Sequence, residues 1–158
     1  MITILSGGQT GVDRAALDAA LEAGIQAGGW CPEGRKAEDG RIPAHYPLRE
    51  LPGGDYLQRT EQNVADSDAT LIIYFGRLQG GTARTLAFCR EWAKPSLLID
   101  GNRVSESEAA AQIKDFVIRE SISRLNVAGP RASGEPRAYR YTLATLALFL
   151  SAGDYSKT

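Results

Sequence analysis

The chain has 158 residues, a length typical of one domain with a single hydrophobic core, so we predict one domain over residues 1–158. Hydrophobic residues make up 43% and charged residues 23% of the chain, as in ordinary globular proteins, and the net charge is −1. That charge argues against a protein that coats nucleic acid through a basic surface, and we therefore expect no nucleic-acid partner.

Three further features of the sequence lead us to expect a cytoplasmic protein. No basic residues precede the short apolar run at the N-terminus, unlike in a signal peptide. The longest apolar-rich stretch, residues 141–152, is too short to cross a bilayer, so we expect no membrane partner. Cys31, Cys89 and the lone His45 form no zinc-binding pattern, which predicts no metal site and two buried thiols in a reducing compartment.

The first half of the chain begins with the pattern of a strand–turn–helix unit. The short aliphatic run over residues 2–5 predicts a buried parallel strand. The alanine-rich run over residues 12–23 predicts a helix that ends at Gly24, and the run over residues 25–30, which contains glycines, predicts a second strand less clearly. Residues 31–54 are rich in proline, glycine and charge, and their apolar members favour an ordered loop packed on the body.

The second half alternates helices and strands more clearly. Helices are predicted over residues 56–65, 82–92, 106–120 and 139–150, and strands over residues 69–75, 96–99 and 125–128. Ser105 is expected to cap its helix, with Glu108 completing a capping box. The alternation predicts an α/β fold, a three-layer Rossmann-like domain with a mostly parallel sheet and helices on both faces. Leucines of the last helix leave a homo-oligomer open, although such residues usually belong to the core.

The first candidate site is the glycine-rich turn between the first strand and helix. Its residues are Ser6, Gly7, Gly8, Gln9, Thr10 and Gly11. Glycines bring backbone N–H groups close to a bound group, and the following helix points its positive dipole end at the same spot, so we predict an anion site. The run matches neither the dinucleotide fingerprint nor a Walker A loop. Asp13, in the first helical turn, either complements the helix dipole or holds a ligand hydroxyl or a neighbouring loop.

Two later turns repeat this pattern after other strands. Gly80, Gly81, Thr82 and Thr85 form the second, to which Arg77 or Arg84 could add charge. Because both turns follow parallel strands, they lie at one edge of the sheet and can face one ligand. In the third turn, which follows Gly129-Pro130, Arg131 and Ser133 are suited to phosphate or carboxylate, although an ordinary exposed turn remains equally open.

Together these segments resemble a family named as molybdenum carriers, within the Rossmann-like group that also holds the LOG phosphoribohydrolases and the DNA-processing protein DprA. The matching runs are ILSGGQTGVDRAALD (4–18), WCPEGRKAEDG (30–40), RTEQN (59–63), SDATL (67–71), GGT (80–82) and LNVAGPR (125–131). The resemblance implies binding of molybdenum cofactor, a pterin that carries a phosphate. The wider group implies nucleotide-derived ligands at the sheet edge.

One departure from the wider group bears on catalysis. LOG enzymes carry a PGGxGTxxE motif whose glutamate assists cleavage of the N-glycosidic bond, and this position falls on Thr85 here. Either Glu33, Asp39 or Glu61 supplies the carboxylate from another loop, or the protein binds without cleaving. We expect a binding protein for a phosphate-bearing small molecule such as molybdopterin or a nucleotide. The alternative is a nucleoside-monophosphate phosphoribohydrolase, and single-stranded DNA binding by analogy with DprA is the weakest reading.

Overall fold

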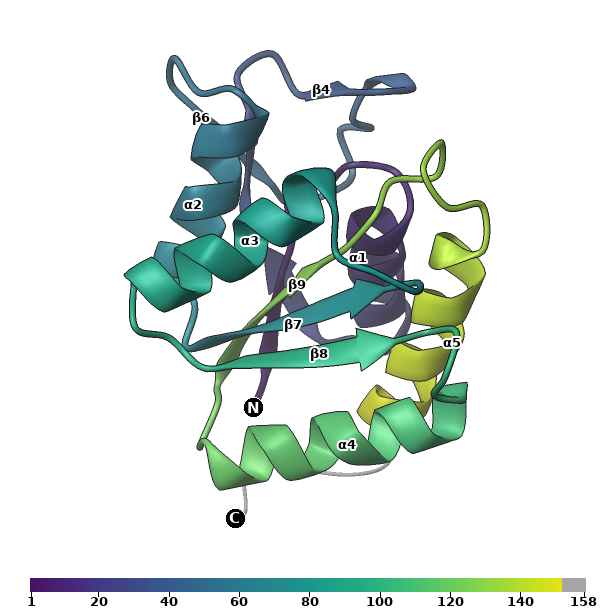
Figure 1. The fold of residues 1–158 in the computed structure, drawn as a ribbon. Coiled ribbons are helices and arrows are strands. Elements are labelled where there is room, and N and C mark those ends of the chain that lie inside the picture. Colours follow the sequence, from purple (N-terminus) through teal and green to yellow (C-terminus); the bar gives the residue numbers. More distant parts are fainter. Residues whose placement is uncertain (152–158) are drawn as a thin grey trace.

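The computed structural model describes residues 1–151, and its centre is a five-stranded sheet in which every pairing is parallel (Figure 1). The strands are β1 (Thr3–Leu5), β2 (Gln26–Gly28), β7 (Ala69–Tyr74), β8 (Ser96–Asp100) and β9 (Arg124–Ala128). Their order across the sheet is β2-β1-β9-β7-β8. The prediction of one domain over residues 1–158 extends past the described part and stays a prediction.

Helices cover both faces of this sheet, as predicted (Figure 1). One layer contains α5 with α1 and α4, each of which contacts α5, and the other contains α2 and α3, which contact each other. Their bounds are α1 (Val12–Glu22), α2 (Tyr56–Asp66), α3 (Gly80–Glu91), α4 (Glu106–Arg119) and α5 (Ala138–Ser151). The three-layer Rossmann-like fold expected from the alternation of elements is therefore confirmed.

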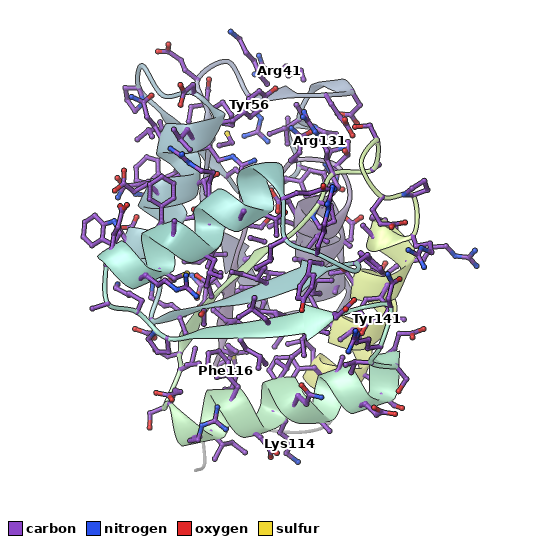
Figure 2. The ribbon with its side chains drawn as sticks, viewed as in Figure 1. Arg41, Tyr56, Lys114, Phe116, Arg131 and Tyr141 are labelled. Atoms are coloured by element: carbon purple, nitrogen blue, oxygen red, sulfur yellow. The ribbon has the colours of Figure 1, made fainter. Side chains whose placement is uncertain are left out.

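The two faces of the sheet differ in how much apolar side chain they bury. The main core lies under α1, α4 and α5, where Ile4, Ile113 and Phe149 are almost completely buried. Figure 2 shows Phe116 between α4 and the sheet, far from Tyr56 and Arg131 at the other end of the molecule. The α2–α3 face holds only a small cluster of Val64, Phe88 and Cys89. The face that carries α3 is thus held by fewer apolar contacts.

The last strand of the chain occupies the middle of the sheet. If β9 is counted first, followed by β1, β2, β7 and β8, the spatial order reads 3-2-1-4-5, which is that of a doubly wound Rossmann sheet. In such sheets ligands bind outside the carboxyl ends of the strands where the order reverses. Here that point lies between β9 and β7.

The segment after β2 forms two small sheets of its own. β3 (Trp30–Pro32) pairs in parallel with β6 (Arg49–Leu51), and β4 (Lys36–Ala37) forms a hairpin with β5 (Gly40–Arg41). The predicted strand over 25–30 was wrong at its end, because Gly29 has a φ of +130° and breaks the strand after Gly28. Ile42 and Tyr46 of the predicted ordered loop are buried, as expected.

Helix caps agree only in part with the sequence interpretation. Ser105 caps α4 by accepting a hydrogen bond from Glu108 N at 3.2 Å, as predicted. The complete capping box lies instead at α2, where the side chains of Asp55 and Gln58 each accept from the other's backbone N–H. Within residues 1–151, no helix combines the length and apolar character needed to cross a bilayer.

Candidate functional site

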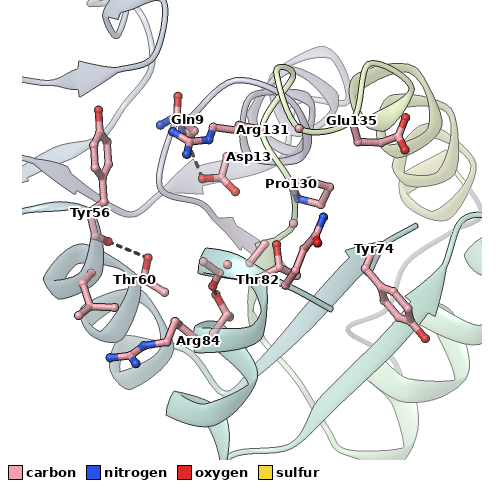
Figure 3. Close-up of a pocket in the computed structure, with 18 of the residues that line it drawn as sticks. Gln9, Asp13, Tyr56, Thr60, Tyr74, Thr82, Arg84, Pro130, Arg131 and Glu135 are labelled. Atoms are coloured by element: carbon pink, nitrogen blue, oxygen red, sulfur yellow. Dashed lines mark hydrogen bonds between the residues drawn. The ribbon is translucent and has the colours of Figure 1, made fainter. Parts of the chain in front are cut away.

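A cleft of about 580 Å³ opens at the carboxyl ends of β9 and β7, the point where the strand order reverses (Figure 3). Its volume is within the range of small-molecule sites. Its walls come from the first turns of α2 and α3 and from the segments that follow β1, β7 and β9. The predicted binding residues that line it are Gln9, Asp13, Gly80, Gly81, Thr82, Thr85 and Arg131.

The N-terminus of α3 opens into this cleft. Its N-cap residue, Gln79, makes no side-chain capping hydrogen bond, and no partner is present within the described residues for the N–H groups of Gly80, Gly81 and Thr82. The first N–H groups of a helix point along its axis and carry its positive dipole end. Thr85 donates its hydroxyl to Gly81 O at 3.0 Å, so this side chain is satisfied within the helix. The open N–H groups form a ready site for an anion.

Cationic side chains outnumber carboxylates around the cleft. Arg59, Arg77, Arg84 and Arg131 line it, against Asp13 and Glu135. Glu135 forms an ion pair with Arg137 at 2.8 Å, and that pairing lowers the pKa of the Glu135 carboxyl. Tyr56, Tyr74 and Phe75 add aromatic surface. The cleft therefore combines positive charge with aromatic walls, which suits an anionic organic ligand.

Asp13 and Arg59 form an ion pair inside the cleft. Asp13 Oδ2 lies 3.4 Å from Arg59 Nη1 and accepts a hydrogen bond from Gln9 N at 3.3 Å. Asp13 is only 3% exposed, and this burial raises its pKa although Arg59 opposes the shift. The guanidinium packs over Gly7, where a Cβ would lie 2.1 Å from Arg59 Nη1. The lack of a side chain at Gly7 therefore makes room for the arginine, and the binding role predicted for Gly7 stays a prediction.

The rest of the first glycine-rich turn is held by contacts within the chain. Ser6 donates its hydroxyl to Asp13 O at 2.8 Å and accepts from Gly8 N. Val12 N, at the start of α1, donates to Pro130 O at 3.2 Å. Gly11 has a φ of +81° and packs so closely that a Cβ would lie 2.4 Å from Pro130 O. Within the described residues no partner is present for the N–H groups of Gly7 and Gly11 either, but these two glycines do not line the cleft, whereas Gly80, Gly81 and Thr82 of α3 do.

The third turn already holds a carboxylate, that of Glu38. This side chain, from the β4–β5 hairpin, accepts hydrogen bonds from Thr10 Oγ1, Ser133 Oγ and Ser133 N, and Arg131 lies 3.9 Å from it. The hydroxyls of Ser133 and Thr10 lower the pKa of the Glu38 carboxyl. Ser133 and Thr10 do not line the cleft, whereas Arg131 does. Sequence reasoning missed Glu38, because nothing local marks a hairpin residue as the partner of groups so distant in the chain.

The three carboxylates proposed as relocated catalytic acids lie elsewhere. Asp39 forms a two-point ion pair with Arg14, at 2.8 and 3.1 Å, and Glu61 accepts from Trp92 Nε1 at 3.1 Å. Glu33 is exposed at the end of β3. None of the three is among the residues that line the cleft. Over residues 1–151, no group of three His, Cys, Asp or Glu residues is arranged to hold a metal ion.

Comparison with known proteins shows the family of the chain. Residues 4–150 match the sequence profile of the "Circularly permutated YpsA SLOG family". The chain belongs to this family. A solved structure from Syntrophus aciditrophicus SB, named "Putative molybdenum carrier protein", shares 50% sequence identity over 95% of both chains with a TM-score of 0.92. No curated protein matches the chain at a significant level.

The family name accords with the sheet topology. A circular permutation moves elements from one end of a chain to the other without changing the fold. In this SLOG protein the central β9 comes last, and counting it first restores the 3-2-1-4-5 order. The turn after β9, with Gly129 and Pro130, therefore takes the place of the first strand–helix turn of an ordinary Rossmann domain. That turn lines the cleft beside α3.

Proposed function

We propose that this protein binds a phosphate-bearing small molecule in the cleft, with the phosphate at the N-terminus of α3. The observation that carries the proposal is the open first turn of α3 at Gly80, Gly81 and Thr82, beside Arg77 and arginines from other elements. Backbone N–H groups, a helix dipole and guanidinium groups together stabilise a phosphate or a similar tetrahedral oxyanion.

The residues of the cleft suit molybdenum as an oxyanion or as part of a cofactor, and not as a bare cation. The neighbour is named as a molybdenum carrier, and this name supports a molybdenum-containing ligand, such as molybdenum cofactor, for this SLOG protein. The open N–H groups of α3 suit the phosphate of molybdopterin or the oxyanion molybdate, and the aromatic lining suits a pterin. In the part of the chain that the structure describes, no residue cluster suits a bare metal cation. We therefore propose an anionic or cofactor-bound form as the cargo.

Binding without cleavage is favoured over the phosphoribohydrolase alternative. Thr85 takes the place of the LOG glutamate, and its hydroxyl is bonded to Gly81 O. The carboxylates that line the cleft are Asp13, paired with Arg59, and Glu135, paired with Arg137. Neither is free to assist the departure of a base. Release of free base from AMP, CMP or GMP by the purified protein would overturn this choice.

Thermal unfolding in the presence of candidate ligands tests the proposal. A ligand at 100 times its Kd stabilises the folded state by about 2.7 kcal/mol, which corresponds to a rise in Tm of roughly 5–10 °C for a chain of this size. The panel is molybdate, molybdopterin, AMP, GMP and inorganic phosphate, with potassium chloride as the ionic control. A rise with at least one of these anions is expected, and a flat response to all of them would contradict the proposal. Native mass spectrometry of freshly purified protein would identify a retained ligand and would show whether the protein is a homo-oligomer. The homo-oligomer and the cytoplasmic location both stay predictions.

A further inference from the structure

Gln9 stands out among the cleft residues because one end of its side-chain amide is fixed. The residue is only 8% exposed and lines the cleft. Its Oε1 accepts two backbone hydrogen bonds, from Thr10 N at 3.1 Å and from Glu38 N at 2.8 Å. Both partners are N–H donors, so the atom that meets them must be the oxygen. The orientation of the amide is thereby determined by its surroundings.

The other end of this amide, Nε2, is a donor without a partner. Within residues 1–151, Nε2 of Gln9 donates no hydrogen bond. This atom is also not one of the unpaired side-chain atoms that are fully buried. It is therefore accessible. Since Nε2 is accessible, water in the cleft can accept from it. A ligand acceptor that enters the cleft can take the place of that water.

Gln9 also lies across the cleft from the proposed phosphate site. Figure 3 shows Gln9 and Arg131 on one wall, with Thr82 and Arg84 of α3 on the other. A phosphate group occupies only a small part of a cleft of about 580 Å³. A ligand that reaches Nε2 of Gln9 while its phosphate is at α3 must therefore carry a second acceptor group at a distance from the phosphate.

We propose that Gln9 is a specificity-determining residue that donates from Nε2 to this second acceptor. The inference rests on the proposed function and narrows the ligand class. The preferred ligand is an organic phosphate with a separate carbonyl, ring-nitrogen or oxyanion acceptor, and a lone inorganic oxyanion is a poorer ligand. Glu38 contributes by its backbone N–H, which holds the Gln9 amide in the donating orientation.

The decisive variant is Gln9→Glu. A glutamate oxygen can still accept from Thr10 N and Glu38 N, so the turn keeps its backbone contacts, but the cleft then meets a carboxylate oxygen in place of a donor. Gln112→Glu, on the exposed face of α4, makes the same change away from the cleft and is the matched control. Gln9→Met removes the Nε2 donor without adding charge, but it also removes the Oε1 acceptor of Thr10 N and Glu38 N, so it is compared with Gln9→Glu, which keeps an acceptor there. Tm values of all three variants report whether each folds.

Calorimetric titrations with AMP, ribose 5-phosphate, pyrophosphate and inorganic phosphate separate the outcomes. Among the probes that carry a second acceptor group, we consider the one that the wild type binds most tightly. We expect Gln9→Glu to lower the affinity for this probe about 10- to 100-fold, and Gln9→Met to lower it about 3- to 10-fold. Inorganic phosphate should be unaffected by Gln9→Met, and Gln112→Glu should change nothing. Unchanged affinity of both Gln9 variants for a probe that the wild type binds would overturn this inference alone. Failure of the wild type to bind any of the four probes would overturn the proposed function, and the inference with it.

Discussion

Asp13 Oδ2 lies 3.4 Å from Arg59 Nη1, and this ion pair joins the first turn of α1 to α2 across the floor of the cleft. Both side chains are largely buried, with exposed fractions of 4% and 12%. Burial alone disfavours the Asp13 carboxylate and raises its pKa. The charge on Asp13 is therefore tolerated because Arg59 is beside it.

Arg59→Met should consequently destabilise the fold most at neutral pH. We expect a loss of about 3 kcal/mol in the free energy of unfolding at pH 7, because a buried carboxylate is left without its cation. The pKa of Asp13 is already raised above its ordinary value, and it rises further without Arg59. A carboxyl with a raised pKa contributes its full stability below its unfolded pKa of 3.8 and loses it as the pH rises through the folded value. The loss should therefore shrink as the pH falls from 7 towards 4.

Urea unfolding of the wild type and this variant at several pH values measures the effect. Arg119→Met is the matched control, because the Arg119 side chain is 63% exposed on α4. It should cost less than about 0.5 kcal/mol at every pH. A loss for Arg59→Met that is equal at pH 4 and pH 7 would show that the pairing with Asp13 is not its cause.

Glu38→Gln should weaken the link between the β4–β5 hairpin and the turn after β9. The pKa of Glu38 is lowered, chiefly by the hydroxyls of Ser133 and Thr10. The stability that this carboxylate contributes is present above its unfolded pKa of 4.5 and is lost as the pH falls through the lower folded value. We expect a loss of about 1–2 kcal/mol at pH 7 and a smaller one near pH 3.

Denaturant unfolding at the two pH values provides the measurement for Glu38→Gln. Glu33→Gln changes an exposed glutamate of the same segment and should be near neutral at both. If Glu38→Gln proved as mild as Glu33→Gln at pH 7, the negative charge of Glu38 would not contribute to the stability of the fold.

Two glycines near the cleft should respond in opposite ways to alanine. Gly11 has a φ of +81°, and its added Cβ would lie 2.4 Å from the backbone oxygen of Pro130. Gly11→Ala should cost about 2–4 kcal/mol, because both the backbone conformation and the close contact oppose it. Around Gly81, in the first turn of α3, a Cβ meets nothing within 4 Å. Gly81→Ala should be neutral or should stabilise the fold by about 0.5–1 kcal/mol, as measured by thermal unfolding. If Gly81→Ala destabilised the protein more than Gly11→Ala, the close packing described at Gly11 would be contradicted.

Much of this arrangement could be predicted from local sequence, and the parts that could not depend on distant contacts. The alternation of apolar strands and helices predicted the three layers. Gly80, Gly81 and Thr82 were predicted to form a glycine-rich turn before a helix, and in the structure they form the first turn of α3 itself. The glycines of the first turn satisfy the same pattern, but two of them are also required by close packing. Only the folded chain shows that Gly7 accommodates Arg59 and that Gly11 accommodates Pro130. Glu38 escaped notice since its partner Ser133 is 95 positions away in the sequence.

Binding of the phosphate at the N-terminus of α3 can be tested with one matched pair of variants at Gly81. Gly81→Asp places a carboxylate at this site, and Gly81→Asn places a neutral side chain of the same shape there. Open space around Gly81 allows both, and a negative charge in the first turn favours the helix, so neither should unfold the protein.

Calorimetric titration of both variants with AMP, molybdate and inorganic phosphate provides the measurement. For each anion that the wild type binds, we expect Gly81→Asp to weaken binding at least about 30-fold, because a like charge occupies the site, whereas Gly81→Asn should stay within about threefold. Wild-type affinity retained by a folded Gly81→Asp protein would show that the N-terminus of α3 does not bind the anion.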